Sequence, residues 1–198
     1  MRSVGCWAIG LVSAFLVSIG DPSTAIEVYP SHAQIQAALD RGTQAAAQHQ
    51  PPEQWYARFG GRGHLDFSGF LVTKIGGVSV LATHMALRGL EPSAADIAQL
   101  VDTPTMLVSA MIFGDSPAFA AESYMVLDQG GRAIKPVTVR VDGQATRTTA
   151  WPESPKFSAK VVAAFKYAEF DPNAHTTITV FPAIGGEVRF AVDFGDIE

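Results

Sequence analysis

The stretch from Glu187 to Phe194, EVRFAVDF, alternates apolar and polar side chains with a period of two. Successive side chains of a β-strand point to opposite faces, so the alternation separates an apolar face from a polar one. A helical period would mix the two kinds of side chain on one surface. The stretch therefore predicts a strand with one buried and one solvent-facing side. The apolar face holds Val188, Phe190, Val192 and Phe194, and the polar face holds Glu187, Arg189 and Asp193.

Strand-like patterns fill the chain from residue 105 to the C-terminus. Met106–Phe113 is almost uniformly apolar, which is typical of a central strand buried on both faces. Turn residues separate the predicted strands, and Asp142-Gly143 indicates a hairpin. About seven strands with such frequent turns predict a mostly antiparallel, immunoglobulin-like β-sandwich in residues 105–198, although the Cys and Trp landmarks of true immunoglobulin domains are absent. The other predicted strands are Phe119–Leu127, Ile134–Val141, Ala145–Ala150, Ser158–Phe170, Thr176–Phe181 and Glu187–Phe194.

Residues 26–104 carry mainly helix signals. Ser31 with Gln34, and Ser93 with Asp96, have the spacing of capping boxes, in which side chains bond the free backbone N–H groups of a first helical turn. The fold class is therefore α+β, with an N-terminal helical segment packed on the sandwich and 26–198 forming one folded unit. The predicted helices run from Ser31 to about Gln48, from about Val78 to Arg88 and from Ser93 to Thr103, and a strand is predicted at Leu65–Lys74.

Residues 1–25 have the parts of a secretory signal peptide. Arg2 precedes an apolar run, Val4–Ile19, and the small residues Ser23 and Ala25 follow it. The run is shorter than the roughly 20 residues that cross a bilayer. We therefore predict cleavage after Ala25, export to the periplasm or the extracellular space, and no membrane span afterwards. The alternative is an anchor that is retained.

Composition limits the classes of partner and chemistry. The chain has 198 residues, of which 47% are hydrophobic, and a formal net charge of −5. An acidic balance disfavours nucleic acid as a partner, because nucleic acid binding requires a basic face. The one cysteine, Cys6, lies in the predicted signal peptide, so a cleaved chain has neither a disulfide nor thiolate chemistry.

No catalytic or metal-binding motif is present. The chain has neither H-E-x-x-H nor G-x-S-x-G, and no two of its five histidines are four residues apart. We predict no metal and no cofactor. The alternative function is a hydrolase or metal-dependent enzyme whose site is assembled from scattered residues such as His64, Asp66 and His84. For His64 and Asp66 we favour a solvated turn that leads into a strand.

The predicted binding surface lies beside a glycine-rich connection, residues 59–64. Interfaces are enriched in Trp, Tyr and Arg. The sequence therefore favours an exported, non-catalytic binding or structural module of the cell envelope that binds another envelope protein or a ligand. The competing interpretation is that the aromatic residues hold the N-terminal helix on the sandwich, and we expect this structural role for Trp55. The predicted binding residues are Trp55, Tyr56, Arg58, Arg62 and His64.

Overall fold

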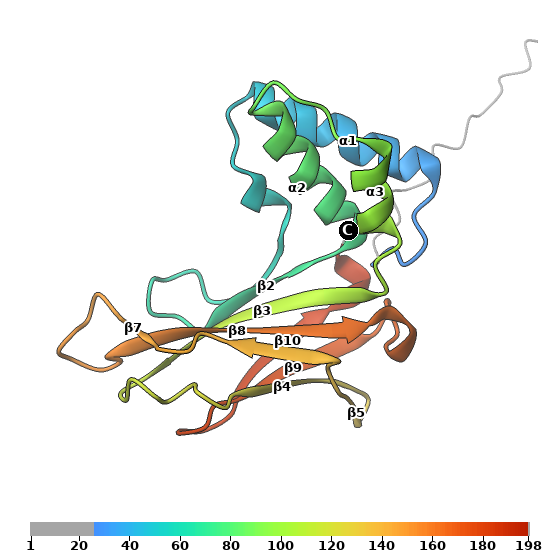
Figure 1. Cartoon of the computed structure of the whole chain (residues 1–198). Coiled ribbons are helices and arrows are strands. Elements are labelled where there is room, and N and C mark those ends of the chain that lie inside the picture. The colour runs from blue at the N-terminus through green and yellow to red at the C-terminus, as the bar shows by residue number, and fades with distance from the viewer. Residues whose placement is uncertain (1–25, 198) are drawn as a thin grey trace, which may run out of the picture.

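The computed structural model describes residues 26–197 and shows helices packed beside two β-sheets (Figure 1). The predicted signal peptide lies outside the described residues. The helices are α1 (His32–Ala47), α2 (Lys74–Ala86) and α3 (Ala94–Val101), with short 3₁₀ turns η1 (Pro52–Trp55), η2 (Tyr167–Glu169) and η3 (Phe194–Asp196). The strands are β1 (Ala57–Gly60), β2 (Ser68–Val72), β3 (Thr105–Gly114), β4 (Tyr124–Gln129), β5 (Arg132–Ile134), β6 (Thr138–Val141), β7 (Thr146–Arg147), β8 (Phe157–Lys166), β9 (His175–Phe181) and β10 (Val188–Asp193).

All strand pairs of the two sheets are antiparallel. The larger sheet has the order β1-β2-β3-β8-β6, with β7 also paired to β8, and the smaller sheet has the order β10-β9-β4-β5. The α+β class is confirmed. The described chain forms ten strands. About seven were predicted in residues 105–198 and one at Leu65–Lys74, which is present with shorter bounds as β2. The two additional strands are β1 and one that arises because the predicted Ile134–Val141 strand is divided into β5 and β6.

The two sheets share one hydrophobic core. In the larger sheet, alternate residues of β3 and β8 point into this core and their neighbours point outward, as the two-residue period of a strand requires. The strand register predicted for EVRFAVDF is confirmed, because Phe190 and Phe194 are buried while Arg189 is exposed. Phe194 lies in η3, just past the end of β10. The fully buried core side chains include Met106, Val108, Ile112, Met125, Leu127, Val161, Phe165, Ile178 and Val180.

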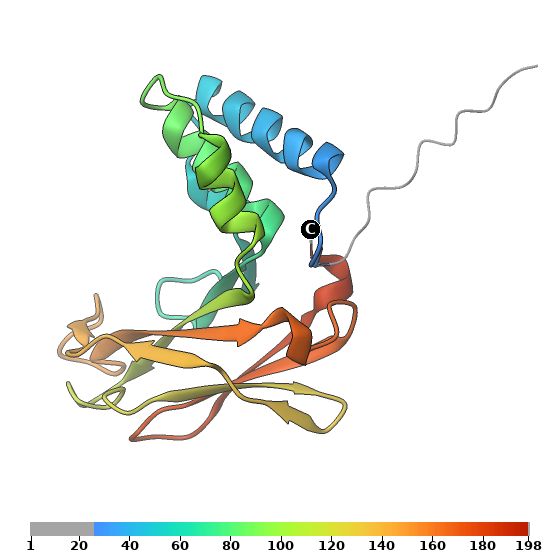
Figure 2. The ribbon, with the colours of Figure 1, turned by 45° about the vertical axis from the view of Figure 1, so that its right-hand side comes forward.

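The helices form a separate layer that rises from one side of the sandwich (Figure 2). This layer has its own small core of Ala38, Ile75 and Val78. Both predicted capping boxes are present, at Ser31 and at Ser93. α2 starts four residues before the predicted helix, because the Thr73 side chain caps it. The prediction began too late because two glycines, which disfavour a helix, lie at the start of α2.

Helices α1 and α2 pack closely against each other at Gly42. A Cβ added to Gly42 would lie 2.5 Å from the Ser79 carbonyl oxygen and 2.6 Å from the Ala82 Cβ. The Ser79 hydroxyl also donates a hydrogen bond of 3.1 Å to the Ala38 carbonyl. The glycine that lowers the helix propensity of this segment is therefore what allows the two helices to pack.

The hairpin predicted at Asp142-Gly143 is wrong. β6 and β7, which flank it, do not pair with each other but follow one another along the same edge of β8. Asp142 joins this edge, since its backbone N–H bonds the Lys160 carbonyl and its carboxylate accepts from the Lys160 N–H at 2.8 Å. Pairing with a distant strand thus overrides the local turn preference.

Four of the strands predicted in residues 105–198 also have different bounds. The Phe119–Leu127 strand starts only at Tyr124, after a buried turn, and Ile134–Val141 is interrupted by Lys135 and Pro136, where the chain passes from the smaller sheet to the larger. Proline has no N–H to donate to a strand partner, which accounts for the break. Ala145–Ala150 reduces to β7, and the Ser158–Phe170 strand gives way to η2 after β8.

Candidate functional site

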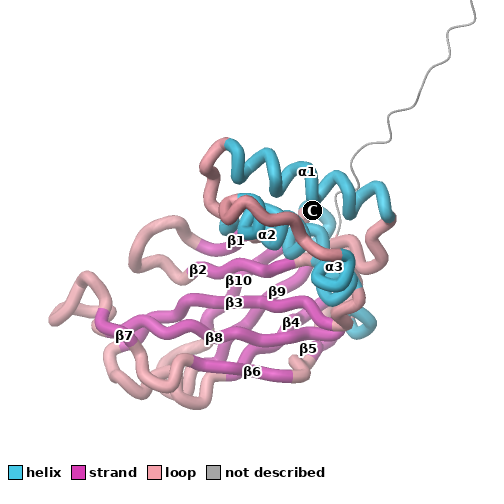
Figure 3. Tube along the Cα trace, turned by 45° about the horizontal axis from the view of Figure 1, so that its top comes forward, coloured by secondary structure: helices cyan, strands magenta, loops and turns pink. Residues whose placement is uncertain are grey.

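The strand register brings one row of side chains across the outer face of the larger sheet. Arg58 on β1 pairs with Phe70 on β2, which pairs with Ser109 on β3. Ser109 pairs with Val162 on β8, which in turn pairs with Arg140 on β6. Directly paired residues point to the same face, so the row has an arginine at each end. Figure 3 looks onto this face and shows that the helices leave most of β3, β8 and β6 uncovered.

A hollow of about 680 Å³ lies over this face at the β1 side. Its floor includes a second row, in which Gly60 pairs with Ser68, Ser68 with Met111 and Met111 with Lys160. Its rim is the glycine-rich connection that follows β1. This volume is within the range of ligand sites, roughly 300–1,000 Å³. The lining residues are Arg58, Phe59, Gly60, Gly61, Arg62, Gly63, Ser68, Gly69, Phe70, Ser109, Met111 and Lys160.

The hollow is cationic. Arg58, Arg62 and Lys160 are exposed, and within residues 26–197 no carboxylate lies within ion-pair distance of any of them. The lining itself contains no aspartate or glutamate. Unpaired cations around a hollow attract anionic groups, and this attraction weakens as salt increases.

Aromatic and apolar groups form part of the same surface. The Tyr56 ring stacks on the Phe70 ring with centroids 4.5 Å apart and planes 11° apart. Phe70 and Met111 are both half-buried and line the hollow. The hollow therefore offers an apolar floor between cationic side chains.

Asp66 fixes the shape of the rim. Its carboxylate accepts a hydrogen bond of 2.7 Å from the Gly63 N–H, and the Gly61 N–H donates to the Phe67 carbonyl at 2.9 Å. A Cβ on Gly63 would lie 2.7 Å from that carboxylate, so the glycine allows the loop to close on Asp66. Arg62 lies in this loop, between β1 and β2, and lines the hollow.

The five predicted binding residues fall into three groups. Arg58 and Arg62 line the hollow, and Tyr56 stacks on its floor. His64 is exposed on the same loop but does not belong to the lining. Trp55 lies elsewhere, at the end of η1.

Trp55 contacts the helical layer. Its indole Nε1 donates a hydrogen bond of 3.1 Å to the Thr83 hydroxyl on α2, and the Arg41 guanidinium of α1 lies 5.7 Å from its ring centroid. These contacts join η1 to α1 and α2 within the helical layer, whereas the expected role was to hold the N-terminal helix on the sandwich.

Lys160 and Arg140 were not predicted as site residues. They are about 100 and 80 residues away from Arg58 along the chain, and only the strand register places them on the same face. A usable signal was nevertheless present in the sequence. The six strands of the larger sheet contain five cationic residues and no acidic residue, in a chain with net charge −5.

The residues of the alternative enzyme hypothesis do not converge. His64 and Asp66 lie in the β1–β2 loop, as the predicted solvated turn, whereas His84 is exposed on the last turn of α2. Within the described part of the chain, no group of three or more His, Cys, Asp or Glu residues could hold a metal ion.

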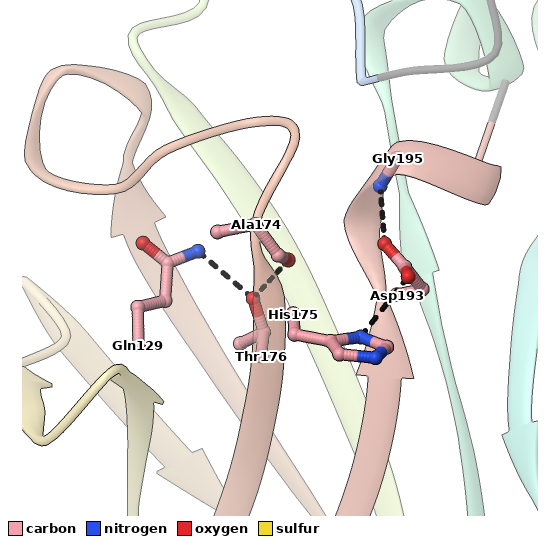
Figure 4. A network of polar contacts seen from close by, with 6 residues as sticks. All are labelled: Gln129, Ala174, His175, Thr176, Asp193 and Gly195. Atoms are coloured by element: carbon pink, nitrogen blue, oxygen red, sulfur yellow. Dashed lines mark hydrogen bonds and ion pairs between the residues drawn. The ribbon is translucent and has the colours of Figure 1, made fainter.

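His175 takes part in a polar network at the ends of β9 and β10 (Figure 4). Its Nδ1 lies 3.0 Å from an Asp193 carboxylate oxygen, and the other Asp193 oxygen accepts a hydrogen bond from the Gly195 N–H. On the neighbouring side, Gln129 donates to the Thr176 hydroxyl at 2.8 Å. Asp171, in the turn that precedes β9, accepts a hydrogen bond from the Asn173 N–H. The network joins strand ends at the surface.

The comparisons with known proteins find no family model and no curated protein that matches this chain. Among the helices of residues 26–197, none has both the length and the apolar character needed to cross a membrane.

Proposed function

We propose that this chain is an exported, non-catalytic binding module of the cell envelope, and that it binds a partner protein through the hollow on the outer face of the larger sheet. The charge distribution carries the proposal: all five charged residues in the strands of this sheet are cationic, although the chain as a whole is acidic. Asp142 and Asp66 lie at the borders of this face, but their carboxylates bond backbone N–H groups of Lys160 and Gly63. The excess of cationic side chains on the strands favours recognition of an anionic partner.

The proposal divides the sequence-predicted residues by role. Arg58 and Arg62 contact the partner, together with Lys160, and Tyr56 supports the floor by stacking on Phe70. Trp55 holds η1 against the helices and is not part of the binding surface. The immunoglobulin-like grouping of the sandwich stays a prediction; two antiparallel sheets packed on one core support it.

Site-specific photo-crosslinking tests the binding face while keeping the three cations that line the hollow, Arg58, Arg62 and Lys160. A photoreactive residue is placed at His64 or at Arg140, which flank the hollow, and the folded protein is irradiated in envelope extract. We expect a protein adduct from both positions. The matched control is Arg88, an exposed residue between α2 and α3 on the helical layer. Adducts from positions 64 and 140 that are no stronger than those from position 88 would refute the proposed face.

Export is the second part of the proposal, and it is supported by the apolar run Val4–Ile19 followed by Ser23 and Ala25. The intact mass of the protein recovered from the cell envelope tests it. We expect a chain that begins at Ile26. A species that keeps Met1 or Arg2 would show that the segment is a retained anchor.

A further inference from the structure

We infer that the hollow binds an extended acidic peptide segment of the partner, with two carboxylates about four residues apart and an apolar side chain between them. This inference rests on the proposed binding function and adds the chemistry of the ligand. It follows from the spacing of the cations, the apolar floor between them and the position of the helical layer.

The cations stand on opposite sides of the hollow. Arg58 is on β1 and Lys160 is on β8, so three inter-strand steps separate them. At about 4.8 Å per step, their backbones are about 14 Å apart across the strands. With each side chain extended over its own strand, the two cations stand on opposite sides of the hollow, and a ligand with two separated anionic groups can contact each of them. Arg62 adds a second cation on the β1 side.

An extended peptide matches this spacing. It advances about 3.3 Å per residue and presents alternate side chains to one side, so residues i and i+4 lie about 13 Å apart on the same side. Residue i+2 points to that side as well and would lie over the middle of the hollow. The groups there are Phe70, Met111 and Ser109, of which the first two are half-buried and apolar in their side chains.

The arrangement of the layers disfavours a flat anionic surface such as a bilayer. The helices α1, α2 and α3 rise above the sandwich on the side of the larger sheet (Figures 1 and 2). A flat surface that approached the sheet would meet this layer first, whereas a single extended chain can lie beside it. A narrow ligand is therefore favoured over a broad one.

Fluorescence anisotropy with a synthetic probe tests the inference. The probe is a fluorescein-labelled peptide with the core Glu-Ser-Leu-Ser-Glu, and the neutral control has Gln in place of both Glu residues. A second control, Glu-Glu-Leu-Ser-Ser, has the same composition with adjacent acids. We expect the probe to bind the mature protein at least tenfold more tightly than either control. Its binding should weaken as salt is raised from 50 to 300 mM, values chosen because they shorten the screening length by a factor of about 2.4.

Charge-reversed variants locate the binding. Arg62→Glu and Lys160→Glu should each weaken probe binding about tenfold, because each variant replaces an attraction by a repulsion. Arg88→Glu makes the same charge change on the helical layer and should leave binding unchanged. Thermal unfolding of all three variants serves as the folding control, and we expect similar melting temperatures because all three side chains are exposed.

Three results would overturn the inference. They are equal binding of the neutral or adjacent-acid peptide, equal loss in Arg88→Glu, and binding of the protein to phosphatidylglycerol vesicles without binding of the peptide. If crosslinks form at His64 and Arg140 while the probe fails, the acidic-peptide inference is wrong and the proposed function stands. If the crosslinks are absent as well, both fail.

Discussion

The Phe59 ring lies 4.9 Å from the Phe190 ring, with an angle of 59° between their planes. Phe59 is on β1, an edge of the larger sheet, and Phe190 is on β10, an edge of the smaller one. Both rings are buried. The pair therefore joins the two sheets at the edge that lies next to the rim of the hollow.

We expect Phe190→Asp to destabilise the protein strongly. Loss of a buried Phe costs roughly 3–5 kcal/mol, and an unpaired buried carboxylate adds to this loss. The control is Arg189→Asp, one residue earlier, which faces solvent and loses only an exposed ion pair with Glu187. Its cost should be about 1 kcal/mol or less. Urea denaturation measures both, and equal losses would contradict the strand register.

Trp55→Ala should lower stability by about 2 kcal/mol, because the half-buried ring packs against the helical layer and its Nε1 bonds Thr83. Trp55→Phe keeps most of the packing and should cost about 1 kcal/mol through the lost hydrogen bond. Arg62→Ala is the matched variant in the binding loop and should leave the melting temperature unchanged. If Trp55→Ala is as silent as Arg62→Ala, Trp55 does not hold η1 to α2.

Gly42→Ala should destabilise the protein, although alanine is the better helix former by about 1 kcal/mol. The added methyl would overlap the Ser79 carbonyl oxygen, which belongs to the backbone of α2, so α1 and α2 must move apart. We expect a net loss of roughly 1–3 kcal/mol, as for other overpacked sites. Gln44→Ala, exposed on the same helix, is the control and should change stability by about 0.5 kcal/mol at most. A stabilised Gly42→Ala protein would show that the helices are not in contact here.

The protein should lose stability as the pH rises above about 10 because of Tyr167. Burial raises the pKa of this phenol above its ordinary value of 10.0, against a smaller opposing effect of hydrogen bonding to the Lys74 backbone. In this range the unfolded chain releases the phenol proton and the folded chain keeps it, so the unfolded state binds fewer protons. The free energy of unfolding then falls by about 1.4 kcal/mol per pH unit because of this group. Below pH 10 the phenol is protonated in both states, and the stability of the protein is not reduced by its ionisation.

Tyr167→Phe tests this linkage, since phenylalanine cannot ionise. The slope of stability against pH, measured by urea denaturation between pH 9 and 11, should be smaller in the variant than in the unchanged protein. Tyr124→Phe, at an exposed position, is the control and should keep the original slope. Identical slopes in all three proteins would show that Tyr167 is not shielded from solvent.

Local patterns predicted the elements that depend on local chemistry. The caps at Ser31 and Ser93 and the alternation around Phe190 are properties of a few adjacent residues, and all three are confirmed. The hairpin predicted at Asp142-Gly143 is wrong because the local turn preference competes with a row of hydrogen bonds to β8, each worth about 1 kcal/mol. Lys160 was not predicted as a site residue, because its place across the hollow from Arg58 depends on the order of four strands, which no short stretch of sequence encodes.

The helical layer and the sandwich have separate hydrophobic cores, so one can open while the other stays folded. The core of the helical layer is small, with two large aliphatic side chains, Ile75 and Val78, fully or nearly buried beside Ala38, whereas the sandwich core holds many. Local opening free energies follow the apolar contacts that an opening breaks. We therefore expect the amide hydrogens of α1 and α3 to exchange with solvent through a partial opening that leaves the amides of β3 and β8 protected. The floor of the hollow would therefore stay folded when the helices detach from the sandwich.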